Sequence, residues 1–215
     1  SYHRIKTPSF HPLRIGRRIR KPAKLNYPLI VKPLREEAST GISQASHVRD
    51  EHEFKERVRF IHENMKMNAI AEEYIHGQEL YVSILGNKKL QSFPIREMQF
   101  TRVPHDMPRI ATYKAKWDEA YRTKWGIVNG FATGAADKNS DKIQSICKRA
   151  YRALNLDGYA RFDCRFTADN KLYIVEANGN PELAMGDEFA ESAEKGGLPY
   201  DKLLRKIVSL AFIRE

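Results

Sequence analysis

The sequence of 215 residues predicts an α+β fold with antiparallel sheets. Some stretches repeat apolar residues every three or four positions, as helices do, whereas others alternate apolar and polar residues, as strands do. Short turns join several of the strands, so hairpins are expected rather than strict alternation of strand and helix. With 41% hydrophobic and 30% charged residues, the chain has the composition of a globular protein that buries a core of its own.

The first part of the chain is expected to form short strands around one amphipathic helix. Lys32-Pro33 should end the first strand, because a proline cannot donate a hydrogen bond to a sheet ladder. Alternation in the last of these strands predicts that one of its two faces is buried. The strands are expected at Leu29–Val31, Ile42–Ala45, Ala69–Ile75 and Glu79–Leu85. The apolar stripe of the helix consists of Phe54, Val58, Ile61 and Met65.

The second part begins with a turn at Gly86-Asn87 that leads into a strand at Leu90–Met98. Residues 99–136 contain two prolines, two tryptophans and several glycines, and are interpreted as a long irregular loop and a candidate lid. Apolar stripes predict helices at Ile143–Leu154 and Tyr200–Ala211. We expect three regions: a basic N-terminal segment at 1–26, a smaller lobe at 27–86 and a larger lobe at 87–215.

The net charge of +10 is concentrated at the front of the chain. Residues 1–32 contain nine Lys or Arg residues and no Asp or Glu, which leaves 28 basic against 27 acidic residues elsewhere. Few aromatic residues lie among the basic ones, whereas proteins that bind single-stranded nucleic acid use such rings for stacking. We therefore favour a solvated segment beside a site for a small phosphorylated ligand over a polynucleotide-binding arm.

Apolar runs are far shorter than the roughly 20 residues that a membrane span needs, and no signal peptide opens the sequence. We expect a cytoplasmic protein with no membrane partner. Cys147 and Cys164 are the two cysteines, and they lack the spacing of a zinc or redox motif. Both are expected to be buried free thiols.

The residues most suited to chemistry lie in a predicted hairpin at 158–178. Side chains alternate between the faces of a strand, so Arg161, Asp163 and Arg165 share one face. A two-residue turn at Asp169-Asn170 would place Asp163 opposite Glu176 and Arg161 opposite Asn178.

Like charges directly opposite each other destabilise a sheet, so a cation is expected between Asp163 and Glu176. Two carboxylates and the amide of Asn178 offer only oxygen atoms, which suits Mg²⁺ with phosphate oxygens completing its coordination. The alternative is a surface hairpin in which arginine and acidic residues form salt bridges.

Magnesium with so few protein ligands usually takes its remaining oxygens from a nucleotide. Lys32 precedes the loop Ser39-Thr40-Gly41, and such loops can offer backbone amides to phosphate. The stretch Glu72-Glu73-Tyr74-Ile75 could bind an adenine edge through its backbone, and the carboxylate of Glu79 could bind a ribose.

Six segments occur in order along most of the chain: Tyr27–Pro33, Glu37–Ser43, Ile70–Leu80, Tyr113–Trp117, Gly158–Asp163 and Glu176–Pro181. This ordered set resembles the ATP-grasp superfamily, specifically its D-alanine–D-alanine ligase-like branch. The resemblance implies two α+β lobes with antiparallel sheets that sandwich the nucleotide. It also implies an ATP-dependent ligase that joins a small carboxylate to an amine, with amino acids or peptides as candidate substrates.

The resemblance also implies a role for each candidate residue. Lys32 would contact ATP phosphate, and Ser39, Thr40 and Gly41 would form the flexible phosphate loop. Glu72, Glu73, Tyr74 and Ile75 would hold adenine, and Glu79 would hold ribose. Asp163, Glu176 and Asn178 would ligate two Mg²⁺ ions, or Mn²⁺ in their place. Lys116 would reach the γ-phosphate, and Arg161 would steady the transferring phosphoryl group and the later oxyanion.

The chain departs from the family at two points. D-alanine ligases have Thr-x-Pro-Gly-Met-Thr and then a serine where this chain has Gly179–Ala184 and then Asp187, so a substrate other than D-alanine is expected. Glu182, Asp187 and Glu188 could favour an amine-bearing substrate or could form the acidic start of a helix. The family also has an N-terminal domain ahead of the point where this chain begins, so a missing domain or partner chain is expected to complete the substrate pocket.

Three hypotheses follow. The first is an ATP- and Mg²⁺-dependent carboxylate–amine ligase that forms an amide through an acyl phosphate. The second is a nucleotide-binding module or incomplete ligase fragment without turnover. The third is polynucleotide binding by the basic N-terminal segment.

Overall fold

The computed structural model describes residues 3–36, 38–104 and 107–212. The chain forms two compact units, each built from segments that are not contiguous in sequence. We call residues 8–75 and 100–128 the loop unit, and residues 1–7, 76–99 and 129–215 the hairpin unit. These units differ from the contiguous lobes expected at 27–86 and 87–215, because a strand that begins at Gln78 pairs inside the hairpin unit.

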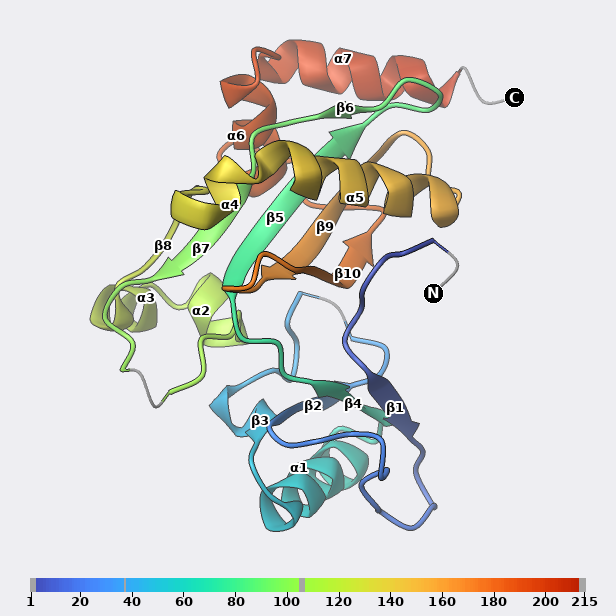
Figure 1. Ribbon diagram of the computed structural model, residues 1–215, viewed down its shortest axis with the longest axis vertical. Helices are drawn as coiled ribbons and strands as arrows, with labels where there is room; N and C mark the ends of the chain where they lie inside the picture. Colours follow the sequence, from blue (N-terminus) through green and yellow to red (C-terminus); the bar gives the residue numbers. More distant parts are fainter. Residues whose placement is uncertain (1–2, 37, 105–106, 213–215) are drawn as a thin grey trace. The chain divides into compact units, whose positions relative to one another are not determined.

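The loop unit contains an antiparallel four-stranded sheet in the order β1-β4-β2-β3, shown in Figure 1. Its strands are β1 (Phe10–Leu13), β2 (Leu29–Pro33), β3 (His47–Val48) and β4 (Ala69–Glu73). The helix α1 (Glu51–Asn64) packs its apolar stripe against this sheet, as its periodicity predicts. Phe54, Val58 and Ile61 are fully buried there together with Leu29 and Val31.

The strand expected at Ile42–Ala45 is not formed. Instead, a 3₁₀-helix (Gln44–Ser46) precedes the short β3. The amide of Ser43 donates to Oγ of Ser46 at 3.1 Å, and the amide of Ser46 donates to the carbonyl of Ser43 at 2.9 Å. Serine side chains compete in this way with sheet pairing, so the local turn replaces the strand.

The hairpin unit contains a larger sheet in the order β10-β9-β5-β7-β8, with β6 pairing β5. Figure 1 shows the helix α5 (Ser140–Ala153) lying across β5 and β9. Its buried residues meet the apolar face of those strands, including Phe162 and Phe166. The strands are β5 (Gln78–Leu85), β6 (Gln91–Ser92), β7 (Arg96–Phe100), β8 (Ile127–Phe131), β9 (Tyr159–Phe166) and β10 (Leu172–Asn178). Two further helices are α6 (Glu188–Lys195) and α7 (Tyr200–Ala211).

The prediction that β5 is half-buried is wrong. Leu80, Val82 and Ile84 face α5, but Tyr81 and Ser83 on the other face are also buried. The reason is tertiary: β5 has β9 and β7 on its two sides, and α6 packs against it as well. Polar residues on the second face therefore need partners inside the fold.

The stretch at 99–136 is more ordered than expected. It contains α2 (Tyr113–Trp117), α3 (Glu119–Trp125), β8 and α4 (Gly134–Lys138), while residues 105–106 lie outside the described part. Side-chain caps explain the short helices, because Oγ1 of Thr112 and Oδ1 of Asp118 each accept a hydrogen bond from the first turn. Helices of five to seven residues are too short to show an apolar period in the sequence.

The strand expected at Leu90–Met98 is divided into β6 and β7, with Pro94 between them.

The two cysteines are free and buried, as expected, with 3.9 Å between the sulfur atoms of Cys147 and Cys164. Among the described residues, no helix combines the length and the apolar character required to cross a membrane.

The N-cap of α1 gives a test of the fold of the loop unit. Oδ1 of Asp50 accepts a hydrogen bond of 2.9 Å from the amide of Glu53. Asp50→Ala should lower the free energy of unfolding by about 1 kcal/mol, as measured by urea denaturation. Asp50→Asn keeps an acceptor oxygen and should lose much less; equal losses in the two variants would show that the cap is not responsible.

Candidate functional site

The hairpin of β9 and β10 brings together the residues expected to bind metal. Asp163 lies opposite Glu176, and Arg161 lies opposite Asn178. The expected two-residue turn, however, is wrong. Phe166 pairs with Leu172, and the amide of Thr167 donates to the carbonyl of Lys171, so three residues form the loop.

A β-bulge between Ile174 and Glu176 restores the expected pairing. Continued from the turn, the register would place Val175 opposite Asp163 and turn Glu176 to the apolar side. The bulge inserts one residue into β10, which brings the carboxylate of Glu176 onto the polar face. Bulges often redirect a side chain beside a functional site, and this one creates the opposed pair of acids.

The guanidinium of Arg161 is held in a defined place. Its Nε lies 2.8 Å from Oδ1 of Asp163, and its Nη2 lies 3.1 Å from Oδ2, which makes a two-pronged ion pair. The guanidinium also lies 5.1 Å from the centroid of the Tyr81 ring. Burial lowers the pKa of Arg161, but the charges of Asp163 and Glu188 outweigh it, so the pKa lies above its ordinary value.

The donor set fits a divalent metal in its chemistry. Asp163 is buried, Glu176 faces it across the hairpin, and Asn178 is the next residue on the same face of β10. Oδ1 of Asn178 accepts a hydrogen bond of 2.8 Å from the amide of Asn180, which orients this amide group. All three offer oxygen, the ligand that Mg²⁺ prefers. Within the described residues, no cluster of three or more His, Cys, Asp or Glu offers another metal site.

The acidic residues after the hairpin have different surroundings. Glu182 accepts hydrogen bonds from the amides of Leu183 and Ala184, so its carboxylate shapes a local turn. Glu188 lies in the first turn of α6, accepts a hydrogen bond of 3.0 Å from Asn129 and lies 3.6 Å from Nη1 of Arg161.

Asp187 is the N-cap residue of α6, but its side chain makes no capping hydrogen bond. Burial raises the pKa of this carboxyl, and the neighbouring charges of Glu188 and Glu182 raise it further. An environment of this kind favours either protonation of the acid or the approach of a cationic group.

The residue expected to hold ribose is engaged in an ion pair. Oε2 of Glu79 lies 2.6 Å from Nη2 of Arg165, and both side chains are about one-tenth exposed. Arg165 also donates to the carbonyl of Gly77 at 3.2 Å. A ribose contact would therefore have to share the carboxylate of Glu79 with this arginine.

The loop unit brings together the residues expected to bind phosphate. Nζ of Lys32 lies 2.8 Å from Oε2 of Glu72 on the paired strands β2 and β4. Gly41 lies against Pro33, the residue after Lys32: a Cβ on Gly41 would be 2.8 Å from Cγ of Pro33. The loop Ser39–Gly41 is thus adjacent to the end of the strand that carries Lys32.

The helix that carries Lys116 is hydrogen-bonded to the same loop. The amide of Tyr113 donates to the carbonyl of Ile42 at 3.1 Å, and Nε1 of Trp117 donates to the carbonyl of Ala38 at 3.4 Å. These bonds hold α2 beside the loop Ser39–Gly41 within the loop unit. Glu37, the first residue of the motif that contains this loop, lies outside the described residues.

The segment expected to hold adenine is anchored on both sides. The amide of Glu73 donates to the carbonyl of Ser9 at 2.8 Å, and the amide of Tyr74 donates to the carbonyl of Pro28 at 3.2 Å. The hydroxyl of Tyr74 accepts a hydrogen bond of 3.2 Å from the amide of Arg109. Ile75, the last residue of the segment, is buried.

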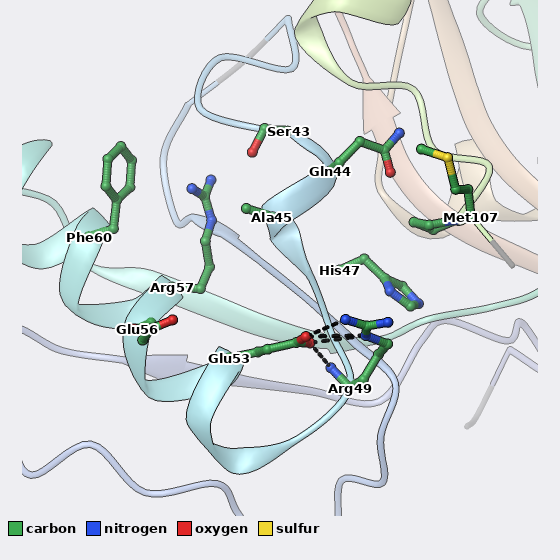
Figure 2. A pocket seen from close by; sticks show the side chains of 11 residues that line it. Ser43, Gln44, Ala45, His47, Arg49, Glu53, Glu56, Arg57, Phe60 and Met107 are labelled. Carbon is green, nitrogen blue, oxygen red and sulfur yellow. Dashed lines mark hydrogen bonds and ion pairs between the residues drawn. The ribbon is translucent and has the colours of Figure 1, made fainter. Parts of the chain in front are cut away.

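A cavity of about 650 Å³ lies in the loop unit, beside the residues that directly follow the loop Ser39–Gly41 (Figure 2). Its wall includes Ser43 and Gln44 from the loop side, Arg57 and Phe60 from α1, and Met107.

The sequence motifs did not identify three residues with notable contacts in the structure: Arg57, Tyr81 and Asn129. Each occurs in a stretch that the sequence pattern interprets as ordinary helix, strand or loop, and only the structure gives its polar or ring contacts.

Comparison with known proteins gives consistent results. Residues 5–209 match the family model described as D-ala D-ala ligase C-terminus. The uncharacterized protein y4sG of Sinorhizobium fredii is 26% identical over 210 residues, covering 98% of this chain and 59% of that protein. A D-alanine–D-alanine ligase of Bordetella petrii is 30% identical over 215 residues, covering 97% of this chain and 60% of the ligase.

A solved structure of D-alanine–D-alanine ligase from Bacillus anthracis, complexed with ATP, superposes with a TM-score of 0.73. It is 22% identical, and the match covers 98% of this chain and 62% of that one. The expected ATP-grasp fold, with its α+β architecture and antiparallel sheets, is confirmed. The chain spans about three-fifths of the length of these relatives.

The raised pKa of Asp187 predicts a pH-dependent effect on stability. An acid that binds its proton more tightly in the folded state makes unfolding easier as the pH rises above its ordinary pKa of 3.8. Asp187→Asn should therefore be more stable than the wild type at pH 7, and the difference should shrink as the pH falls toward 4.

Thermal unfolding of both proteins across this range measures the effect. Asp201→Asn on the exposed side of α7 controls for the loss of one acidic group. A stability difference that stays constant with pH would contradict the prediction.

Proposed function

Because the chain belongs to the family of D-alanine–D-alanine ligase C-terminal domains, we propose that it carries the ATP- and Mg²⁺-binding residues of a carboxylate–amine ligase. One observation carries the proposal: the buried Asp163 lies directly opposite Glu176 and is paired with Arg161. Arg161 in turn lies opposite Asn178, so the acids, the amide and the guanidinium are neighbours on the hairpin. A salt-bridged structural hairpin would account for the Arg161–Asp163 pair, whereas the proposal also accounts for the opposed acid Glu176 and the amide of Asn178 on the same face.

In this proposal the loop unit binds the nucleotide. Lys32 and the loop Ser39–Gly41 contact the phosphates, Lys116 approaches the γ-phosphate, and Glu72–Ile75 bind adenine. The support is that Lys32, the loop and the helix of Lys116 are joined by packing at Pro33 and by hydrogen bonds at Ala38 and Ile42. A lysine near the end of a strand, next to a loop with backbone amides, is suited to an anionic ligand.

The hairpin unit supplies the ligands for Mg²⁺, namely Asp163, Glu176 and Asn178. When bound, the metal would neutralise charge on the phosphate oxygens. Arg161 complements it from the same face. Because Asp163 and Tyr81 hold its guanidinium, little reorganisation is needed when negative charge develops on the phosphoryl group.

The proposed reaction has two steps. A substrate carboxylate oxygen attacks the γ-phosphorus of ATP, so that ADP leaves and an acyl phosphate forms. The nitrogen of an amine then attacks the acyl carbon, phosphate leaves, and the nitrogen loses a proton to give an amide. The residues on this chain act by positioning and by charge neutralisation, which are the main sources of catalysis in phosphoryl transfer.

The substrate is proposed to carry a cationic amine near Asp187. Of the three acidic residues after the hairpin, Glu182 and Glu188 are engaged in local bonds, whereas Asp187 makes no capping bond. The raised pKa of Asp187 indicates a site that an ammonium group would stabilise. The expected acidic start of a helix is also present, since Glu188 and Glu191 lie in the first turn of α6.

Metal-dependent nucleotide binding tests the proposal. Calorimetry with a nonhydrolysable ATP analogue should show binding that strengthens at least about tenfold when Mg²⁺ is added. Glu176→Gln should remove most of this gain, because it removes one of the two opposed charges, whereas Glu194→Gln on the exposed side of α6 should retain it. An analogue that neither binds nor stabilises the wild-type protein with Mg²⁺ present would refute the proposal.

Turnover is tested separately by phosphate release from ATP across a panel of amino acids and dipeptides. We expect release with a pair that includes a second cationic amine, and Asp187→Asn should reduce release for that pair by roughly tenfold or more. ATP binding without release for any pair would identify a nucleotide-binding module instead. Binding of polynucleotide without ATP would favour the basic segment at 1–26 as the functional region.

A further inference from the structure

The helix α1 carries a buried arginine in its apolar stripe. Phe54, Val58 and Ile61 face the sheet, and Arg57 occupies the same stripe with 7% of its surface exposed. A buried charge is costly unless hydrogen bonds compensate for it. Burial also lowers the pKa of Arg57, because it disfavours the charged form of the guanidinium.

The hydrogen bonds of Arg57 lead to the phosphate-binding region. Its Nε donates to the carbonyl of Val31 at 3.4 Å, and its Nη2 donates to the carbonyl of Gly41. Val31 directly precedes Lys32, at the point where β3 has stopped pairing with β2. Figure 2 shows the side chain of Arg57 rising from α1 toward the loop that carries Ser43. One guanidinium therefore joins the helix, the strand end and the loop.

The backbone of the loop is fixed at the position that Arg57 contacts. Gly41 has φ of +72°, and a Cβ there would lie 2.7 Å from Cε of Met65. Other carbonyls of the loop also accept hydrogen bonds: the carbonyl of Ser39 accepts from the amide of Ile42, and the carbonyl of Ile42 accepts from the amide of Tyr113. Within the described residues, the amides of Thr40 and Gly41 donate to no acceptor.

We propose that Arg57 is a positioning residue for phosphate binding, which holds the Gly41 carbonyl against α1 and β2 so that the loop amides remain available to phosphate. The inference rests on the proposed function, because it concerns the same loop. A loop ordered in advance avoids an ordering cost that binding would otherwise bear. Arg57 acts through the loop and need not touch the nucleotide.

Nucleotide binding provides the first test. Arg57→Met keeps a long apolar stem but removes the donors, so the Kd of a nonhydrolysable ATP analogue with Mg²⁺ should rise about tenfold. The Kd of adenosine, which lacks phosphate, should not change. Arg57→Lys retains one cationic donor and should show a smaller rise, and Arg59→Met, an exposed arginine of the same helix, should show none.

An equal loss of affinity for the analogue and for adenosine would overturn the inference, since general damage to the fold predicts that result. An unchanged affinity for both would also overturn it. If Arg57→Met does not fold, Arg57→Lys decides by the same comparison.

Amide hydrogen exchange without nucleotide tests whether Arg57 anchors the loop through the Gly41 carbonyl, independently of the proposed function. Exchange in a peptide covering residues 38–46 should be several-fold faster in Arg57→Met than in the wild type, with no change in Arg59→Met. If the anchor is confirmed but the wild type binds no ATP analogue, the proposed function fails and the phosphate role of Arg57 fails with it. If the wild type binds the analogue but exchange does not change, Arg57 alone is wrongly assigned.

Discussion

The polar face of the hairpin unit depends on the neutralisation of one buried carboxylate. Asp163 lies on a central strand with 5% of its surface exposed, so its charge requires a partner inside the fold. Arg161 is that partner, and its own contacts extend to Tyr81 on β5 and Glu188 on α6. Glu188 in turn accepts from Asn129 on β8. A single ion pair thus connects four elements, and loss of either member would leave a buried charge, at a cost of roughly 3–5 kcal/mol.

Two cations of the loop unit, the buried Arg57 and the partly buried Lys32, have different partners. Arg57 bonds backbone carbonyls instead of a carboxylate, whereas Lys32 pairs with Glu72 on the two inner strands of the sheet. Carbonyl groups accept hydrogen bonds from the guanidinium but carry no net charge, so the loop Ser39–Gly41 remains next to a positively charged group. A carboxylate at that place would repel the same ligand. These partners are consistent with the proposed phosphate site at the loop and the proposed metal site at the carboxylates of the hairpin.

Much of this arrangement could be predicted from local sequence patterns. The stripe at Phe54, Val58 and Ile61 and the alternation along β9 depend on neighbouring residues only, and both are confirmed. The pairing of Asp163 with Glu176 is also as predicted, but for a different reason: a three-residue loop and a bulge shift the register in opposite directions. Burial of both faces of β5, and the contacts of Arg57 with Val31 and Gly41, depend on distant segments that no local pattern reports.

The bulge in β10 separates residues that build the core from residues that face the candidate site. Before it, Leu172 and Ile174 are committed to the apolar core; after it, Glu176 and Asn178 lie on the polar face. Between β10 and the buried Phe189 of α6, only Pro181 is buried and Leu183 packs against the core, so most side chains of this segment are outside the core. Within it, Glu182 and Glu188 satisfy the fold, and Asp187 carries a raised pKa that no capping bond relieves. The proposed amine-bearing substrate would offset the cost of charging this residue, because an ammonium group beside Asp187 favours the charged form of its carboxyl.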